Sequence, residues 1–162
     1  MTASQYAEMY EGLYRLFDDV TPLKGKDCGR LCGAACCRGD EKTGMLLFPG
    51  ETTSLDVVGS AGRRLAVCRG FCDRGERPLS CRIFPLFPAV LPDGGIEVLP
   101  DARGFSVCPL VRRYQDVRFS AKFVGRVRLC GQILSRDPAC ADFLKEITEE
   151  IRSLELLRGS LG

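Results

Sequence analysis

Apolar side chains recur at helical spacing near the start of the chain. Within residues 4–18 these positions are Tyr6, Met9, Tyr10, Leu13, Tyr14 and Phe17. The spacing predicts an amphipathic helix with an aromatic stripe, which Thr2 and Gln5 would begin as a capping box and Thr21-Pro22 would end. A stripe of this kind is typical of the side of a helix that faces a core, so we expect packing rather than stacking on a cofactor.

A second group of helical repeats occupies the last third of the chain. Apolar residues recur at helical spacing over 110–134 and predict a helix there, which Gly125 weakens in the middle. A further helix is expected to begin with Asp137 as its N-cap and Pro138 at its first position, and to end at Gly159.

Residues 25–110, between these helices, contain short apolar runs separated by glycine and proline. The segment holds 13 of the 18 glycines and seven of the nine prolines, so short strands and many turns are expected. Strands are predicted at 45–48 and 65–67, and a hairpin over 86–99 with its turn at 92–95.

These patterns together predict an α+β fold. We expect a small, irregular, cysteine-rich metal-binding centre with short strands and a hairpin, clasped by N- and C-terminal helices. A chain of 162 residues has the length of a single domain, here 1–162. Its parts would be the helix at 4–18, the cysteine-cluster region at 25–110 and the C-terminal helices at 111–158.

Composition and charge narrow the range of functions. The 23 basic and 21 acidic residues give a formal net charge of +2, which argues against a nucleic-acid partner. The absence of histidine excludes His-based catalytic triads and zinc sites that use histidine. No signal peptide or membrane span is evident, so we expect a cytoplasmic location and no membrane partner. Clustered cysteines there usually hold metal or do redox chemistry; an exported protein with five disulfides is the alternative.

Ten cysteines are the main chemical feature of the chain. Eight of them follow the pattern Cys28-x₃-Cys32-x₃-Cys36-Cys37, Cys68-x₃-Cys72-x₈-Cys81 and Cys108. Tetrahedral zinc takes four thiolates at about 2.3 Å, and ligands close in sequence, with glycines among them, let the chain turn around the ion. We predict that these eight are metal ligands. The other two, Cys130 and Cys140, lie in helical segments and are expected in the core.

The adjacent pair Cys36-Cys37 favours more than one ion. Neighbouring side chains diverge by about 100° on a helix and about 180° on a strand, so both can reach one ion only in an irregular turn. On one straight helix, the sulfurs of Cys28, Cys32 and Cys36 would span about 12 Å. Either the segment bends or these cysteines serve different ions, and we expect two Cys₄ centres.

Several known cysteine motifs are absent. There is no C-x₂-C, which excludes simple zinc ribbons and thioredoxin-like pairs. The bacterial ferredoxin run is missing, and Ala35 stands where a radical enzyme of the C-x₃-C-x₂-C type would need cysteine. Zinc is the cofactor we expect, with iron or an iron–sulfur cluster as the alternative, because all of them accept thiolate ligands.

The chain resembles the YkgJ-like cysteine-cluster family of zinc- or iron-chelating domains in two segments, which occur in the order CGRLCGAACCRG and then ERPLSCRIFP. The resemblance covers roughly residues 27–110, although the leading run has three-residue gaps where the family often has two. It implies metal chelation and no defined reaction. It implies a ligand role directly for Cys32, Cys36, Cys37 and Cys81, and less directly for Cys28, Cys68, Cys72 and Cys108.

Charged residues near the cysteines could support such a site. The arginines are Arg30, Arg38, Arg69, Arg74, Arg77 and Arg82. Their N–H groups could stabilise the negative charge that four thiolates keep around Zn²⁺ or a [4Fe–4S]²⁺ core, and Arg77 and Arg82 are the best candidates. The alternative is that the arginines are solvated surface charge. Weaker candidates, as oxygen ligands, are Asp40, Glu41 and Glu51.

The sequence therefore predicts a metal-chelating protein that binds zinc or iron through all-thiolate sites. The alternative is an iron–sulfur protein that transfers electrons or senses redox state. An enzyme that uses zinc as a Lewis acid is disfavoured, because neither a histidine nor a motif-placed carboxylate is available. Metal ions are the partners expected, and the sequence identifies no protein partner.

Overall fold

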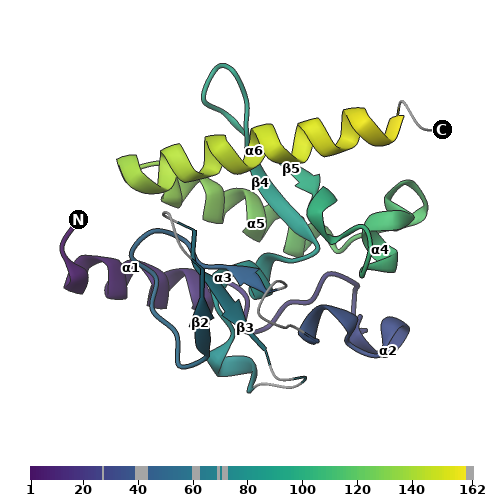
Figure 1. Cartoon of the computed structure of the whole chain (residues 1–162), viewed down its shortest axis with the longest axis horizontal. Helices are drawn as coiled ribbons and strands as arrows, with labels where there is room; N and C mark the ends of the chain where they lie inside the picture. Colours follow the sequence, from purple (N-terminus) through teal and green to yellow (C-terminus); the bar gives the residue numbers. More distant parts are fainter. Residues whose placement is uncertain (27, 39–43, 60–62, 69, 71–72, 160–162) are drawn as a thin grey trace.

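Two small antiparallel sheets organise the chain (Figure 1). The computed structural model describes residues 1–26, 28–38, 44–59, 63–68, 70 and 73–159. The α-helices are α1 (Ala3–Arg15), α2 (Gly29–Cys32), α3 (Leu79–Ile83), α4 (Pro109–Arg112), α5 (Ala121–Leu134) and α6 (Pro138–Gly159). The strands are β1 (Met45–Leu46), β2 (Asp56–Val58), β3 (Leu65–Val67), β4 (Leu86–Val90) and β5 (Ile96–Pro100). Single 3-10 turns are η1 (Ala35–Cys37), η2 (Arg74–Glu76), η3 (Ala102–Gly104) and η4 (Tyr114–Asp116).

The β4–β5 hairpin forms the platform for the two long C-terminal helices. Its strands pair from Leu86 opposite Pro100 to Val90 opposite Ile96, which confirms the predicted hairpin. Helices α5 and α6 both pack against β4 (Figure 1). A Cβ on Gly131 of α5 would lie 2.5 Å from the Pro88 side chain, so this glycine allows helix and strand to approach closely.

The second sheet lies close to α1 and α3. Its strand order is β1-β3-β2, with the central β3 antiparallel to both neighbours. Strands β1 and β3 confirm the predictions at 45–48 and 65–67, although β1 ends at Leu46. Strand β2 was not predicted. Because the strands span only two or three residues, the sheet depends on the helices beside it for its stability.

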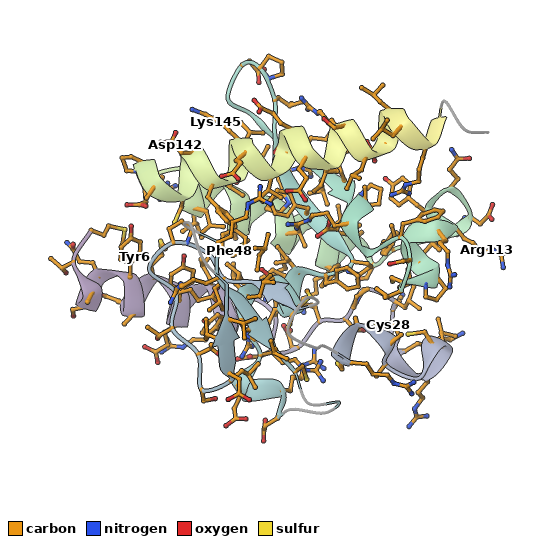
Figure 2. All side chains as sticks on the ribbon, viewed as in Figure 1. Tyr6, Cys28, Phe48, Arg113, Asp142 and Lys145 are labelled. Carbon is orange, nitrogen blue, oxygen red and sulfur yellow. The ribbon has the colours of Figure 1, made fainter. Side chains whose placement is uncertain are left out.

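The core joins the N-terminal helix to the hairpin and to α5 and α6. Two aromatic pairs lie in this core. Phe17, just after α1, packs on Phe123 of α5 at 5.9 Å between ring centroids. Phe48, which follows β1 and is labelled in Figure 2, packs on Phe143 of α6 at 5.1 Å. Phe17, Phe48 and Phe123 are almost completely buried, and each such side chain contributes about 1.5–3 kcal/mol by leaving water. The aromatic stripe of α1 therefore packs inward, as predicted.

Helix boundaries at both ends of the chain confirm the predicted caps. Thr2 and Gln5 form the capping box of α1. The Asp137 carboxylate accepts a hydrogen bond from the Cys140 N–H at 3.0 Å, at the start of α6. The helix α6 runs from Pro138 to its predicted end at Gly159.

The single helix predicted over 110–134 is wrong in its first half. Helix α4 ends at Arg112, and α5 begins only at Ala121. Ser120 stops a continuous helix, because its N–H donates to the Pro22 carbonyl at 2.9 Å and its hydroxyl caps α5. The apolar residues of 113–120 pack around Cys108 instead of along a helix face. No helix in the described part of the chain is long and apolar enough to cross a membrane.

Candidate metal centre

The segment 28–38 folds as two short helical turns with a reversal between them. Helix α2 ends at Gly33 (φ 61°), and Ala34 is also left-handed (φ 54°), before η1 carries the adjacent cysteine pair. The chain therefore bends between Cys32 and Cys36, which was one of the two arrangements predicted. The left-handed region costs a residue with a Cβ roughly 1–2 kcal/mol, so Ala34 is a strained position in this turn.

Five of the predicted ligands line one cavity of about 110 Å³. They come from three parts of the chain that are distant in sequence: the 28–38 segment, the residue after β3, and α3. These cysteines are Cys28, Cys36, Cys37, Cys68 and Cys81. Met45, Ala66 and Phe84 form part of the apolar wall. Folding thus brings together thiols that the sequence separates by more than 40 residues.

Two further predicted ligands lie beside this group. Cys108 is 7% exposed and packs with Leu110 and Val111, and Cys28 contacts the same cluster. Burial raises the pKa of the Cys108 thiol, and the nearby charge of Cys32 raises it further. Cys28 therefore adjoins both the cavity and the cluster that contains Cys108. The eighth predicted ligand, Cys72, lies outside the described residues.

The sulfurs of the leading run are close enough to influence one another. A hydrogen bond with Cys37 and burial raise the pKa of the Cys36 thiol, and the charges of Cys37, Cys28 and Cys32 raise it further. Without a cation, ionising several of these thiols together is unfavourable, because like charges in a partly buried site repel.

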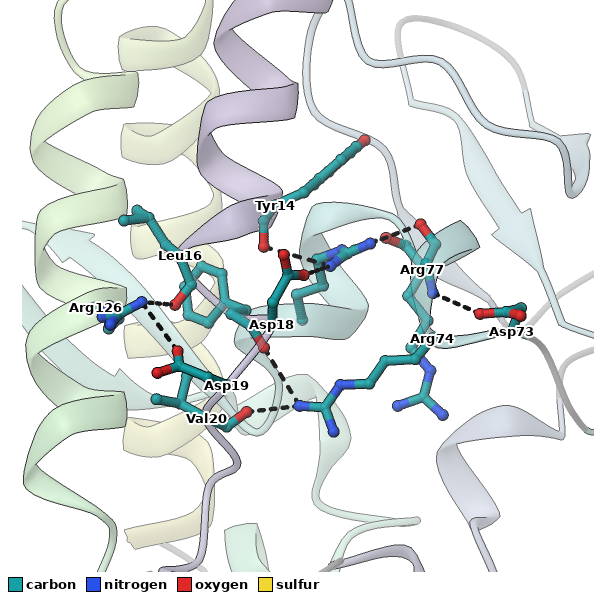
Figure 3. Close-up of polar contacts among 12 residues, drawn as sticks. Tyr14, Leu16, Asp18, Asp19, Val20, Asp73, Arg74, Arg77 and Arg126 are labelled. Carbon is teal, nitrogen blue, oxygen red and sulfur yellow. Dashed lines mark hydrogen bonds and ion pairs between the residues drawn. The ribbon is translucent and has the colours of Figure 1, made fainter.

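Three arginines line the same cavity, and main-chain carbonyls hold two of them, Arg74 and Arg82, in place. Arg74 donates to the carbonyls of Phe17 and Val20, at 3.3 and 2.7 Å, just beyond α1 (Figure 3). Arg82, whose side chain is 5% exposed, also forms an ion pair with Asp18 at 3.3 Å. The third is Arg77. The cavity therefore has guanidinium groups fixed beside its thiols.

The hydrogen bonds of Arg82 connect α3 to the loop before it and to α1. Its Nε donates to the Arg77 carbonyl and its Nη2 to the Gly75 carbonyl, both at 2.7 Å. Its guanidinium carbon lies 4.6 Å from the centroid of the Tyr14 ring. Arg82 thus fixes the helix that carries Cys81. Its contacts are to carbonyls and to Asp18, so the stabilisation of thiolate charge expected of it stays a prediction.

The remaining candidates from the sequence are placed elsewhere. Arg38 donates to the Gly33 carbonyl at 3.3 Å and is exposed, and Arg30 is not among the residues lining the cavity. Arg69 lies outside the described residues, as do the proposed oxygen ligands Asp40 and Glu41.

Glu51, the third oxygen-ligand candidate, is fully buried and has a structural role instead. Its carboxylate accepts hydrogen bonds from the N–H groups of Leu79 (2.6 Å) and Phe48 (3.0 Å) and from the Tyr14 hydroxyl (2.7 Å). Burial raises the pKa of Glu51, and these three contacts oppose that shift. Because Leu79 is the first residue of α3, Glu51 caps the helix that carries Cys81. No sequence motif indicated this role.

Cys130 and Cys140 lie in the core, as predicted. Both are completely buried, in α5 and α6. The Tyr10 hydroxyl is 3.7 Å from the Cys140 sulfur, and neither cysteine lines the thiol cavity.

The donor chemistry of the cavity fits a thiophilic metal. Its potential ligands are thiols, which suit zinc and iron centres, and its arginines can offset the charge of a thiolate complex. Among the described residues, which do not include Cys72, no three or more Cys, Asp or Glu side chains are gathered tightly enough to hold an ion. The cysteines thus share one region without being in coordination geometry.

Comparison with known proteins gave no match among family models, curated proteins or solved structures.

Proposed function

We propose that this protein is a metal-chelating cysteine-cluster protein that binds zinc or iron through thiolate ligands. The observation that carries the proposal is the convergence of five cysteines, from three distant segments, on one cavity. Free cysteines in a core are normally dispersed and inert. A shared cavity with fixed arginines is instead the arrangement that an anionic metal–thiolate complex requires.

A bound metal would supply the positive charge that makes ionisation of neighbouring thiols favourable. The chain's own contribution is to bring the thiols together and to balance their charge. The turn at Gly33 and Ala34 places the adjacent pair, and the caps and hydrogen bonds around α3 place Cys81.

We further propose two centres. Five cysteines line the cavity, and one of them, Cys28, also packs against the cluster that contains Cys108, so the described thiols of this region exceed the four that one tetrahedral ion uses. With Cys72, the eight predicted ligands would suffice for two Cys₄ sites. The resemblance to the YkgJ-like family supports the same ligand set through its motifs. A cytoplasmic location belongs to this proposal, because reduced thiols are needed for ligation.

Metal and sulfide analysis of protein purified without oxygen tests the proposal. About two zinc or iron ions per chain are expected. Acid-labile sulfide with absorbance near 400 nm would identify iron–sulfur clusters and the electron-transfer or redox-sensing alternative. A folded protein that carries no metal, and binds none when zinc or ferrous iron is added, would contradict the proposal.

Variants of single cysteines test the assignment of ligands. Cys37→Ser and Cys81→Ser should lower metal content and thermal stability together. Cys130→Ala is the matched control, because Cys130 is a buried cysteine of α5 away from the cavity; it should keep its metal. Equal loss of metal in all three variants would refute the assignment.

A further inference from the structure

A second and larger cavity, of about 530 Å³, adjoins the thiol cavity. It lies among η1, the β1–β3 strands, the η3 turn with the residues that follow it, and Glu150 of α6. Cys36 and Cys68 line both cavities. We propose that this second cavity binds a small organic anion with an apolar body. The proposal goes beyond metal binding and is tested separately from it.

The size and lining of the cavity fit a small molecule. Ligand pockets typically measure about 300–1,000 Å³ and combine an apolar lining with a few polar groups. Here the apolar walls include Met45, Leu65, Phe84 and Val107. An aromatic or branched aliphatic body would bury its surface against these side chains.

The charges that line the cavity are mostly paired. Arg103 forms a bidentate pair with Asp101, with N–O distances of 2.8 and 2.7 Å. Arg63 pairs with Glu150 at 3.0 Å and also with Glu146, which does not line the cavity. These pairs fix the walls and leave little charge for a ligand to neutralise.

Arg38 is the lining cation without a carboxylate partner among the described residues. Its guanidinium donates a 3.3 Å hydrogen bond to the Gly33 carbonyl. A guanidinium has five N–H donors in a planar fork, which suits a carboxylate, phosphate or sulfonate group. Arg38 is exposed, so it is available at the solvent-facing side of the cavity to bind the anionic end of a ligand.

The thiol cavity next to the second cavity has its own arginines, which can offset the negative charge of thiolates, so this charge need not repel an anionic ligand. Arg74, Arg77 and Arg82 line the thiol cavity and are not among the residues of the second one. Their charge can offset thiolates in that cavity, whereas Arg38 lines the second cavity and not the first. Because Cys36 and Cys68 belong to both walls, a molecule bound here would lie directly beside the metal–thiolate centre.

Titration with 8-anilinonaphthalene-1-sulfonate, an aromatic sulfonate, tests the proposal on the full chain as purified. Saturable binding of one probe per chain is expected, with a rise in fluorescence. Arg38→Gln should weaken it about tenfold, because a charge-assisted contact is lost. Ser106→Trp should abolish it, since Ser106 lines the cavity and is exposed, so that the indole can fill the space.

Arg113→Gln is the matched control. Arg113, which is labelled in Figure 2, is 75% exposed and is not among the residues that line this cavity, so its loss should leave binding unchanged. A cooperative thermal transition in each variant excludes binding of the probe to a loosened fold. The neutral analogue N-phenyl-1-naphthylamine should bind at least tenfold more weakly than the sulfonate.

The proposal is overturned if the probe does not saturate at one per chain, or if Arg38→Gln and Ser106→Trp both bind like the unmodified protein. Equal affinity for the neutral analogue, or loss of binding in Arg113→Gln, would also overturn it. Metal content is measured on every sample. A metal-loaded protein that does not bind the probe refutes the ligand site alone. A protein that binds the probe but holds no metal, even after zinc or ferrous iron is added, refutes the metal proposal alone.

Discussion

Glu51→Gln is the substitution whose effect follows most directly from the contacts of the buried carboxylate. One carboxylate oxygen accepts from Leu79 N–H and the Tyr14 hydroxyl, and the other accepts from Phe48 N–H. Glutamine has the same shape but only one accepting atom. In either orientation of the amide, its NH₂ group faces a backbone N–H that previously had an acceptor.

The size of the effect can be worked from that mismatch. Glu51 is fully buried, and leaving one buried donor without an acceptor costs about 1–3 kcal/mol. In a chain of 162 residues, each kcal/mol corresponds to a fall of about 2–4 °C in the melting temperature. A fall of about 2–12 °C is therefore expected. Because Leu79 begins α3, weaker metal binding through Cys81 should accompany it.

Urea unfolding of the metal-loaded protein, followed by circular dichroism, measures the free energy directly. Glu11→Gln is the control, because Glu11 is 67% exposed and only pairs with Arg15; it should change stability by less than about 0.5 kcal/mol. The Tyr14→Phe variant and the double variant with Glu51→Gln should show non-additive losses. An unchanged urea midpoint for Glu51→Gln would refute the assigned role of the carboxylate.

Three other outcomes are expected. Gly33 has a φ of 61°, so Gly33→Ala should lower the free energy of unfolding by about 1–2 kcal/mol and weaken metal binding in a chelator competition. Gly12→Ala, in an open position of α1, should instead raise the free energy of unfolding by about 0.5–1 kcal/mol. A Gly33→Ala variant more stable than Gly12→Ala would contradict the strained turn. Arg82→Met removes two 2.7 Å hydrogen bonds to carbonyls and should lower the free energy of unfolding by about 2–4 kcal/mol, and a loss below 1 kcal/mol would show that water replaces them. Burial raises the pKa of Cys140 to about 12 and also raises that of Cys130, so both thiols stay protonated at pH 8. Iodoacetamide should modify neither until denaturant is added, which mass spectrometry of peptides would show.

Local sequence signals were sufficient where an element is determined by its own residues. Thr2 at the start of α1, Asp137 and Pro138 at the start of α6, and the Pro-Asp-Gly-Gly turn at 92–95 all act within a few positions. These elements were predicted correctly. The break between α4 and α5 depends on a partner far along the chain, because the Ser120 N–H donates to the Pro22 carbonyl. No local pattern contains that information.

The candidate site also has features that the sequence predicted and features that only the structure revealed. The spacing of the cysteines indicated which residues carry the chemistry, and it predicted that the 28–36 run would bend if its members acted together. Which sulfurs share a cavity depends on how α3 packs beside the small sheet. Two hydrogen bonds that place α3 are the one from the Leu79 N–H to Glu51 and the one from Arg82 to the Tyr14 carbonyl. Both join residues far apart in the sequence, so they were found only in the structure.

The contacts of Arg74 and Arg82 couple the local stability of the end of α1 to ligand binding in the thiol cavity. Both guanidiniums line that cavity while donating to carbonyls in the segment that ends and follows α1. A ligand bound in the cavity stabilises every segment that must be ordered for binding, by an amount that grows with occupancy. Amide hydrogen exchange at the end of α1 should therefore slow when metal is bound. The exchange rate then measures the fraction of protein that holds metal, without the need for a coloured metal centre.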